Sequence, residues 1–99
     1  MIAYRHPIYE EHRPVTDDNI VTDEYLDTLP EKYVASALLA IEAGFDGVDV
    51  KSCHGYLLAE LSSAYTRPGM YGGSYENRTR LFRNGILAAK PYETESFKV

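Results

Sequence analysis

The sequence predicts an α/β protein built around one helix–strand–helix unit, and three observations lead to this prediction. Residues 30–43 carry apolar side chains at helical spacing, and Gly44 suits the left-handed end of that helix. Residues 45–50 alternate apolar and polar side chains, and one residue separates them from the helix, as in tight helix-to-strand connections. A second amphipathic stretch, 75–89, follows a glycine-rich loop. This order is typical of parallel α/β units rather than of helical bundles.

The first part of the chain is predicted to be an irregular connection. Residues 1–22 contain Pro7 and Pro14 and few apolar residues at regular spacing, a pattern typical of loops. We expect Tyr4 and Tyr9 to pack this segment against the rest of the protein.

The first helix has two possible starts. Thr22 could begin a helical turn that carries Leu26, and Pro30 would then either interrupt a longer helix or open a new one. Thr28 and Glu31 have the spacing of a capping box, and proline is tolerated in a first turn because its missing N–H would have no partner there. The pattern therefore favours a helix over 30–43, with an apolar face formed by Tyr33, Val34, Ala37, Leu38 and Ile41.

Two more helices are predicted after the strand. A short one covers 56–62, where Leu57, Leu58 and Leu61 are apolar. Ser74 is a suitable N-cap for the helix 75–89, and Pro91 should end it. We expect the polar residues 91–99 to form a frayed tail.

Composition limits the class of protein. Ninety-nine residues suffice for one domain, 1–99, and the net charge of −5 argues against a nucleic-acid partner. A single cysteine excludes an intramolecular disulfide framework. No apolar run approaches the roughly 20 residues that span a bilayer, and the N-terminus lacks the apolar region of a secretory signal. The sequence therefore predicts a cytoplasmic protein with no membrane partner.

A cluster of titratable side chains directly follows the predicted strand. Lys51, His54 and Tyr56 lie within six residues, and the loops after parallel strands carry the ligand sites of α/β enzymes. Lysine and histidine can donate hydrogen bonds to an oxygen that gains negative charge, and tyrosine can donate a proton. That set suits the reduction of an activated double bond. The alternative is a solvated Lys51, a His54 that caps a turn and a Tyr56 in the core.

Three other patterns have competing interpretations. Cys53 and His54 could bind a metal or form a nucleophile–base pair, but two adjacent residues are too few for the first and poorly placed for the second, so we expect no metal site. Gly72 and Gly73 could cradle a phosphate or form a tight turn, and the turn is favoured because no P-loop lysine is present. Arginines in the same stretch could contact a ligand or form ion pairs with Glu60 or Glu76: Arg67, Arg78 and Arg80.

Two stretches resemble the central signature of a known family: AGFDGVDV and HGYLLAELSSAYTRPGMYGGSYENRTR. They are similar to the old yellow enzyme family, the FMN-dependent NADH:flavin oxidoreductases. The resemblance covers residues 33–83, about half of the chain. The combination of AGFDGV, HGYL and YGGSxENR at these spacings is specific to the family.

The resemblance implies a TIM barrel that holds FMN at the carboxyl ends of its strands. Residues 45–50 would then be its fourth strand and 30–43 the helix before it. Lys51 and His54 occupy two positions that bind the oxygen of the substrate's activating group, and Tyr56 occupies the position of a proton-donating tyrosine. FMN would supply hydride after reduction by NADH or NADPH. The flavin-binding residues of the family lie on other strands, so none is assigned here.

The chain also departs from the family pattern. Lys51 stands where histidine is usual, Leu81 stands where phenylalanine is common, and Gly85 does not follow the expected helix. A barrel needs about 250 residues, so we expect an internal fragment of such an enzyme, inactive alone and without tight FMN binding. Its substrate would be a small molecule in which an oxygen-containing, electron-withdrawing group activates a C=C bond, or a related molecule that is oxidised.

A second hypothesis places the chain outside catalysis. A small helical protein or truncated gene product of this kind would expose apolar helix faces. It would then associate with a partner or with itself through those faces.

Overall fold

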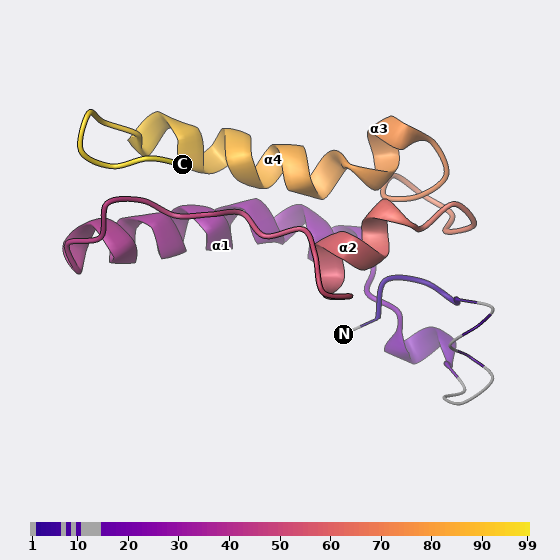
Figure 1. The fold of residues 1–99 in the computed structure, drawn as a ribbon. Helices are drawn as coiled ribbons and strands as arrows, with labels where there is room; N and C mark the ends of the chain where they lie inside the picture. The colour runs from indigo at the N-terminus through magenta and orange to yellow at the C-terminus, as the bar shows by residue number, and fades with distance from the viewer. Residues whose placement is uncertain (1, 7, 9, 11–14) are drawn as a thin grey trace.

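The computed structural model describes residues 2–6, 8, 10 and 15–99, and this part of the chain is helical (Figure 1). The elements, in chain order, are the 3-10 helix η2 (Asp17–Asn19), the α-helices α1 (Asp23–Glu42), α2 (Leu57–Ser62), α3 (Tyr75–Arg78) and α4 (Arg80–Ala89), and the 3-10 helix η3 (Lys90–Tyr92). The isolated β-bridges between described residues are two, both parallel: Ile2 with Ile20 and Gly47 with Lys98. Of the predicted irregular segment, Tyr4 is buried as expected, whereas Pro7, Tyr9 and Pro14 lie outside the described residues.

Helix α1 is longer than the favoured prediction. The Thr22 side chain caps it by accepting a hydrogen bond from the Tyr25 amide at 3.1 Å, and Pro30 lies inside the helix. The predicted capping box is wrong, because the Thr28 hydroxyl donates to the Tyr25 carbonyl at 2.7 Å instead. Proline removes one helical hydrogen bond. Complete burial of Leu26 and the earlier cap stabilise the turns before Pro30.

The helices after the strand segment agree with the sequence prediction except for one break. Helix α2 covers the predicted stretch, and Ser74 caps α3 by accepting from the Asn77 amide at 3.2 Å. Thr79 then interrupts the predicted single helix, so that α3 and α4 are separate. Beyond Ala89 the chain continues through Pro91 as η3.

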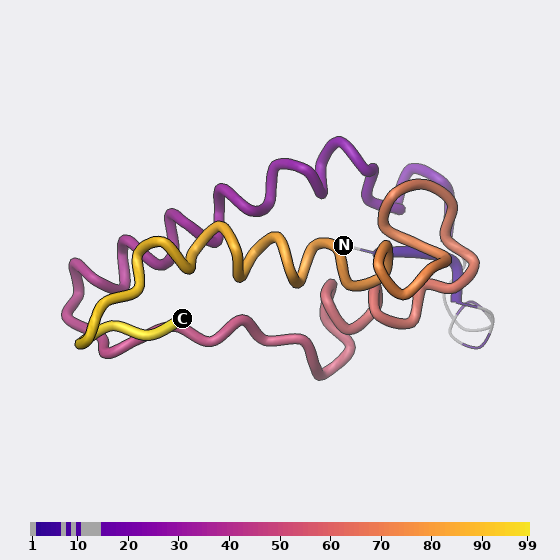
Figure 2. The backbone as a smooth tube through the Cα atoms, turned by 90° about the horizontal axis from the view of Figure 1, so that it is seen from above, coloured from indigo at the N-terminus to yellow at the C-terminus, as the bar shows by residue number. Residues whose placement is uncertain are grey.

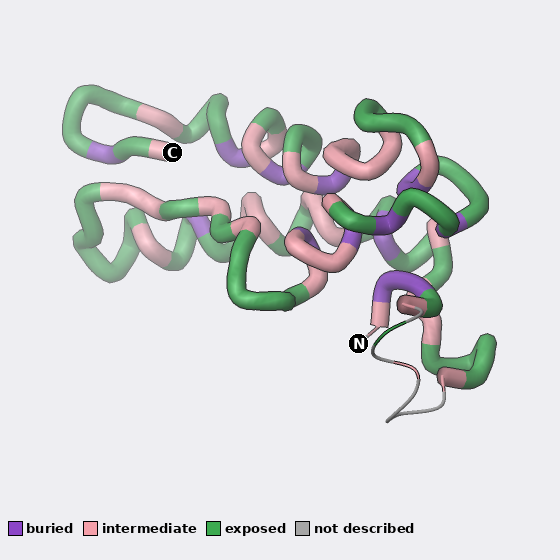
Figure 3. The backbone as a smooth tube through the Cα atoms, turned by 45° about the vertical axis from the view of Figure 1, so that its right-hand side comes forward, coloured by how far each residue is buried: buried purple, intermediate pink, exposed green. Residues whose placement is uncertain are grey.

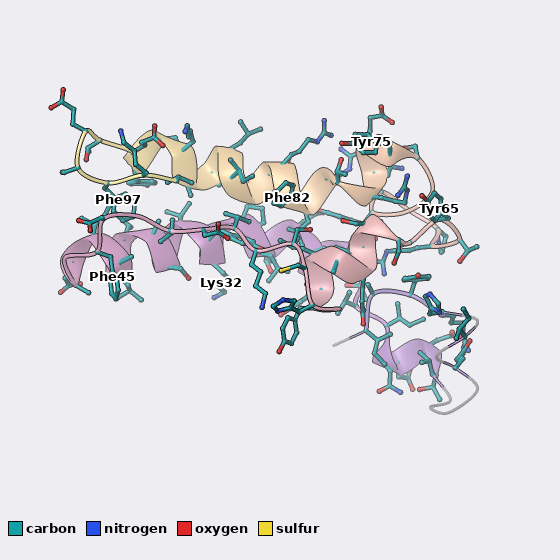
Figure 4. All side chains as sticks on the ribbon, viewed as in Figure 1. Lys32, Phe45, Tyr65, Tyr75, Phe82 and Phe97 are labelled. Atoms are coloured by element: carbon teal, nitrogen blue, oxygen red, sulfur yellow. The ribbon has the colours of Figure 1, made fainter. Side chains whose placement is uncertain are left out.

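The core lies between α1 and α4, which run side by side in both views (Figures 1 and 2). Its larger cluster joins both helices to α2 and the N-terminal segment, and consists of Ala3, Tyr4, Leu26, Leu58, Leu61, Ala64, Tyr71 and Leu81. Phe82 packs against this cluster from the side of α4 that faces α1 (Figure 4). A Cβ atom at Gly85 would lie 3.0 Å from the Tyr33 ring, so the glycine lets the two helices approach.

The predicted strand does not form in this structure. Residues 45–50 are half-buried or exposed, and their only strand-like pairing with another described residue is the bridge from Gly47 to Lys98. A strand needs a neighbour along its length to satisfy its backbone groups, and the end of the chain supplies one residue. The α/β prediction is therefore confirmed for the helices and wrong for the strand, within the described part of the chain.

The end of the chain is packed rather than frayed. Phe97 is buried with Ala37 and Ala89 in a second cluster, at the end of the molecule opposite the N-terminal segment (Figure 4). The Glu93 carboxylate accepts hydrogen bonds from the Lys90 ammonium at 2.7 Å and the Val99 amide at 3.1 Å, and the bond from Lys90 lowers the pKa of Glu93. The prediction of a frayed tail was wrong because it did not account for Phe97, whose aromatic ring packs into the open end between α1 and α4.

The outer surfaces of the helices are exposed (Figure 3). Several large apolar side chains lie on these surfaces: Leu38, Leu39, Ile41 and Leu87. Phe45, shortly after the end of α1, is exposed as well. None of the helices in the described ranges has the length and apolar character needed to cross a membrane.

Candidate functional site

The candidate site begins on the segment between α1 and α2. Side chains alternate along it: Val48 and Val50 are half-buried, and Asp49 and Lys51 are exposed. Val48 packs against the cluster around Phe97, and Val50 against the larger core. Because successive side chains of an extended segment point to opposite faces, packing of the two valines turns Lys51 away from the helices.

A tight turn follows and carries His54. Its φ of +62° lies in the left-handed region, and Gly55 follows with a φ of +69°. Among residues other than glycine, histidine and asparagine are several-fold enriched in this conformation. The left-handed turn therefore accommodates histidine at position 54. The backbone at residue 55 is also left-handed, and glycine adopts this conformation without steric cost.

The structure brings Lys51 and Tyr56 together. The Lys51 ammonium lies 4.8 Å from the centroid of the Tyr56 ring, within the range of a cation–π contact. Tyr56 also precedes α2, and its carbonyl accepts the Glu60 amide at 2.9 Å. Tyr56 is 68% exposed, so the alternative that Tyr56 packs in the core is wrong. His54 is exposed on the turn between them.

Cys53 is a free, exposed thiol in the same loop. In the described ranges of the chain, no three histidine, cysteine, aspartate or glutamate side chains gather closely enough to hold a metal ion.

Arg67 has a role that the sequence did not reveal. Its guanidinium is buried and donates to the Val21 carbonyl at 2.8 Å, to Asp23 Oδ1 at 2.7 Å and to the Ala3 carbonyl. The other Asp23 oxygen accepts the Met70 amide at 2.7 Å. Arg67 therefore ties the N-terminal segment, the start of α1 and the loop after α2 into one unit. The ion pair suggested with Glu60 or Glu76 is wrong for this arginine.

The glycines and Arg78 of the YGGSxENR stretch also serve the fold. A Cβ at Gly72 would lie 2.2 Å from the Arg67 carbonyl oxygen, and Gly73 has a φ of +78°. The Gly73 amide donates to Ala64 at 3.0 Å, and Arg78 donates to the Gly73 carbonyl at 3.0 Å. The Arg78 guanidinium also stacks 3.8 Å from the Tyr65 ring centroid. The Gly73 amide and the Arg78 guanidinium could each bind a phosphate, but both already form hydrogen bonds within the protein. This favours the tight-turn interpretation.

A cleft of ≈750 Å³ lies between the N-terminal segment and the loop around Arg67. Its arginines are already paired: Arg5 with Glu10 and Asp17, and Arg67 with Asp23, each at 2.7 Å. A phosphate placed there would meet carboxylates, and the described lining residues include no free cation to balance them. The described residues around this cleft therefore do not fit the phosphate end of a flavin nucleotide.

Comparison with known proteins identifies the family. Residues 2–90 match the NADH:flavin oxidoreductase / NADH oxidase family. The chain belongs to this family. The match confirms the resemblance seen in the sequence, and it extends well beyond residues 33–83.

Individual members of the family are similar over most of this chain. An NADPH dehydrogenase from Halalkalibacterium halodurans is 43% identical over 68 residues, which are 67% of this chain and 20% of that protein. 12-oxophytodienoate reductase 1 from Oryza sativa subsp. japonica is 48% identical over 61 residues, covering 60% of this chain and 16% of the reductase. A flavin oxidoreductase from Emericella nidulans is 42% identical over 78 residues, covering 77% and 19%. The chain thus spans about a fifth of the length of these curated relatives, and no solved structure matches it.

Proposed function

We propose that this chain forms the substrate-side loop of a flavin-dependent oxidoreductase of the NADH:flavin oxidoreductase / NADH oxidase family. One observation carries the proposal: Lys51 lies over the exposed Tyr56 ring, within the segment that matches the family. His54 lies on the turn between them. The three side chains are open to a small molecule.

Each side chain has a distinct role in the proposed reaction, the reduction of a C=C bond activated by an oxygen-containing group. Lys51 and His54 donate hydrogen bonds to that oxygen and stabilise the negative charge that develops on it. The Tyr56 hydroxyl donates a proton to carbon. The cation–π contact with Lys51 holds the Tyr56 ring in place.

Lys51 makes this site different from one with two imidazoles. An ammonium is a compact charge on a flexible stem, whereas an imidazole donates in a fixed direction. The lysine therefore favours strongly polarised oxygen acceptors over weakly polarised ones.

FMN, reduced by NADH or NADPH, supplies the hydride in this proposal. The family description and the relatives named NADPH dehydrogenase and 12-oxophytodienoate reductase support this assignment. We assign Lys51, His54 and Tyr56 to the substrate rather than to the phosphate of the flavin. The flavin site would then lie in other parts of an enzyme.

This assignment predicts weak flavin binding by the 99-residue chain. Titration with FMN, followed by flavin fluorescence, should show no saturable binding in the submicromolar range, because the arginines of the cleft are paired with carboxylates. The NADPH dehydrogenase of H. halodurans serves as the positive control. Submicromolar saturable binding by the chain would contradict the assignment of its residues to the substrate side alone.

A chimera tests the proposed function itself. Residues 33–83 replace the matching segment of the H. halodurans NADPH dehydrogenase, and NADPH-dependent reduction of an α,β-unsaturated ketone is measured. We expect turnover comparable to the parent enzyme, because the transplanted loop carries the oxygen-binding and proton-donating groups. A chimera that folds and binds flavin but does not reduce the ketone would refute the proposal.

A further inference from the structure

The loop that carries the candidate site is anchored in the core at both ends. Val50 packs against the larger core cluster just before the loop, and Leu57 packs against the same cluster just after it. Lys51 follows the first anchor and Tyr56 precedes the second, and the chain bends sharply before it enters α2 (Figure 1). The backbone of residues 52–55 therefore decides how the side chains of Lys51 and Tyr56 lie relative to one another.

This bend contains two consecutive left-handed residues, His54 with a φ of +62° and Gly55 with a φ of +69°. In the part of the chain that the structure describes, His54 is the only residue other than glycine with a positive φ. A side chain in this conformation lies too close to the following carbonyl oxygen, and only glycine avoids that cost. Any other residue at position 55 would place two such strained residues next to one another.

Backbone conformation, rather than lack of space, explains the glycine at position 55. A Cβ atom built there would have no other atom within 4 Å. Gly72 differs in this respect, because a Cβ there would lie 2.2 Å from the Arg67 carbonyl oxygen. A substitution at Gly55 would therefore change the preferred backbone conformation of the loop without creating a steric clash.

We propose that Gly55 is a positioning residue for the proton donor. Its left-handed backbone directs the chain so that the Tyr56 ring lies 4.8 Å from the Lys51 ammonium while Tyr56 stays exposed. Gly55 has no side chain and acts on the reaction only through Tyr56. The catalytic part of this inference rests on the proposed function. The geometric part, that the turn brings Lys51 and Tyr56 together, does not.

A series of substitutions at position 55 tests the catalytic part in the chimera. A residue that resists the left-handed conformation relieves its strain by rotating the loop backbone, and this moves the Tyr56 hydroxyl away from the substrate carbon. We expect the rate of flavin reoxidation by the ketone to fall about tenfold in Gly55→Ala and further in Gly55→Val, because catalysis is sensitive to displacements of about 1 Å. Gly55→Asn should stay within about threefold, since asparagine adopts the left-handed conformation more readily.

Gly44→Ala is the matched control for Gly55→Ala. Gly44 also has a positive φ, +81°, and a Cβ there would likewise have no atom within 4 Å. It follows the end of α1 rather than the site loop. The substitution should therefore introduce comparable backbone strain and lower the stability of the protein to urea, but leave the reoxidation rate within about twofold of the unmodified chimera.

Nuclear magnetic resonance of the 99-residue chain tests the geometric part without any catalysis. The Tyr56 ring current should shift the methylene protons next to the Lys51 ammonium to high field, because the ammonium lies over the ring. Tyr56→Leu removes the ring and gives the unshifted reference. We expect Gly44→Ala to keep the shift and Gly55→Ala to lose most of it, with Gly55→Asn between the unmodified chain and Gly55→Ala.

The two measurements separate a failure of this inference from a failure of the proposed function. An unchanged Lys51 shift in Gly55→Ala, an unchanged reoxidation rate in the Gly55→Ala chimera, or equal losses of rate in Gly44→Ala and Gly55→Ala would each overturn the positioning role of Gly55. A folded, flavin-bound chimera that cannot reduce the ketone would refute the proposed function instead. The Lys51 shift would then still decide whether the turn brings Lys51 and Tyr56 together.

Discussion

Arg67→Met is expected to destabilise the protein by about 3 kcal/mol, since it leaves a largely buried carboxylate without its cation. Arg67 is 7% exposed, and its partner Asp23 has a side chain that is 26% exposed. The variant would also leave the carbonyls of Ala3 and Val21 without the donor that now serves them. Urea denaturation followed by circular dichroism measures the loss.

Two further variants test whether this loss is specific to the buried guanidinium of Arg67. Arg83 is exposed, and its hydrogen bond to the Glu76 carbonyl is long, at 3.3 Å. Arg83→Met should therefore change stability by less than about 0.5 kcal/mol. Arg67→Lys should not restore full stability, because an ammonium cannot reproduce the planar set of donors. A loss below about 1 kcal/mol for Arg67→Met would show that Arg67 does not hold these segments together.

Tyr56→Phe in the chimera is expected to slow ketone reduction at least about a hundredfold, the usual effect of removing a positioned proton donor. The change keeps the ring beneath the Lys51 ammonium, 4.8 Å from its centroid, and removes only the hydroxyl. Turnover with NADPH and ketone in steady state measures the loss.

Tyr65→Phe is the matched control for this variant. Tyr65 is 67% exposed, close to the 68% of Tyr56, and its ring also lies beside a cation, that of Arg78. It has no proposed role with substrate, so turnover should remain within about twofold of the chimera. Equal losses in both variants would mean that the effect of Tyr56→Phe is structural.

The helices were predictable because their signals are local. Ser74 and the leucines of α2 act within a few residues of their own position, and spacing along the sequence is enough to find them. The start of α1 was harder. Thr22 and Thr28 are both plausible caps, and burial of Leu26 against residues far along the chain decides between them.

The remaining features depend on contacts between distant segments. Arg67 and Asp23 are 44 residues apart, and no local pattern shows that they meet. The segment 45–50 has the alternation of a strand, but strand formation depends on neighbours that sequence spacing does not supply. Phe97 lies in a polar stretch of sequence, and its burial depends on contact with Ala37 of α1 and Ala89 of α4.

The candidate site was predicted in part. The position of Lys51, His54 and Tyr56 after an apolar segment indicated a polar loop, and the family signature gave them roles. Spacing alone could not show that Lys51 lies over Tyr56, since that contact depends on the left-handed turn at His54 and Gly55.

Rapid mixing of the Tyr56→Phe chimera is the most direct test of whether Tyr56 donates the proton, because it separates the two halves of the reaction. Flavin absorbance reports reduction by NADPH in one experiment and reoxidation by an α,β-unsaturated ketone in the other. We expect an unchanged rate of flavin reduction and a reoxidation rate lower by at least about a hundredfold. Reoxidation by the ketone at the rate of the unmodified chimera would contradict it.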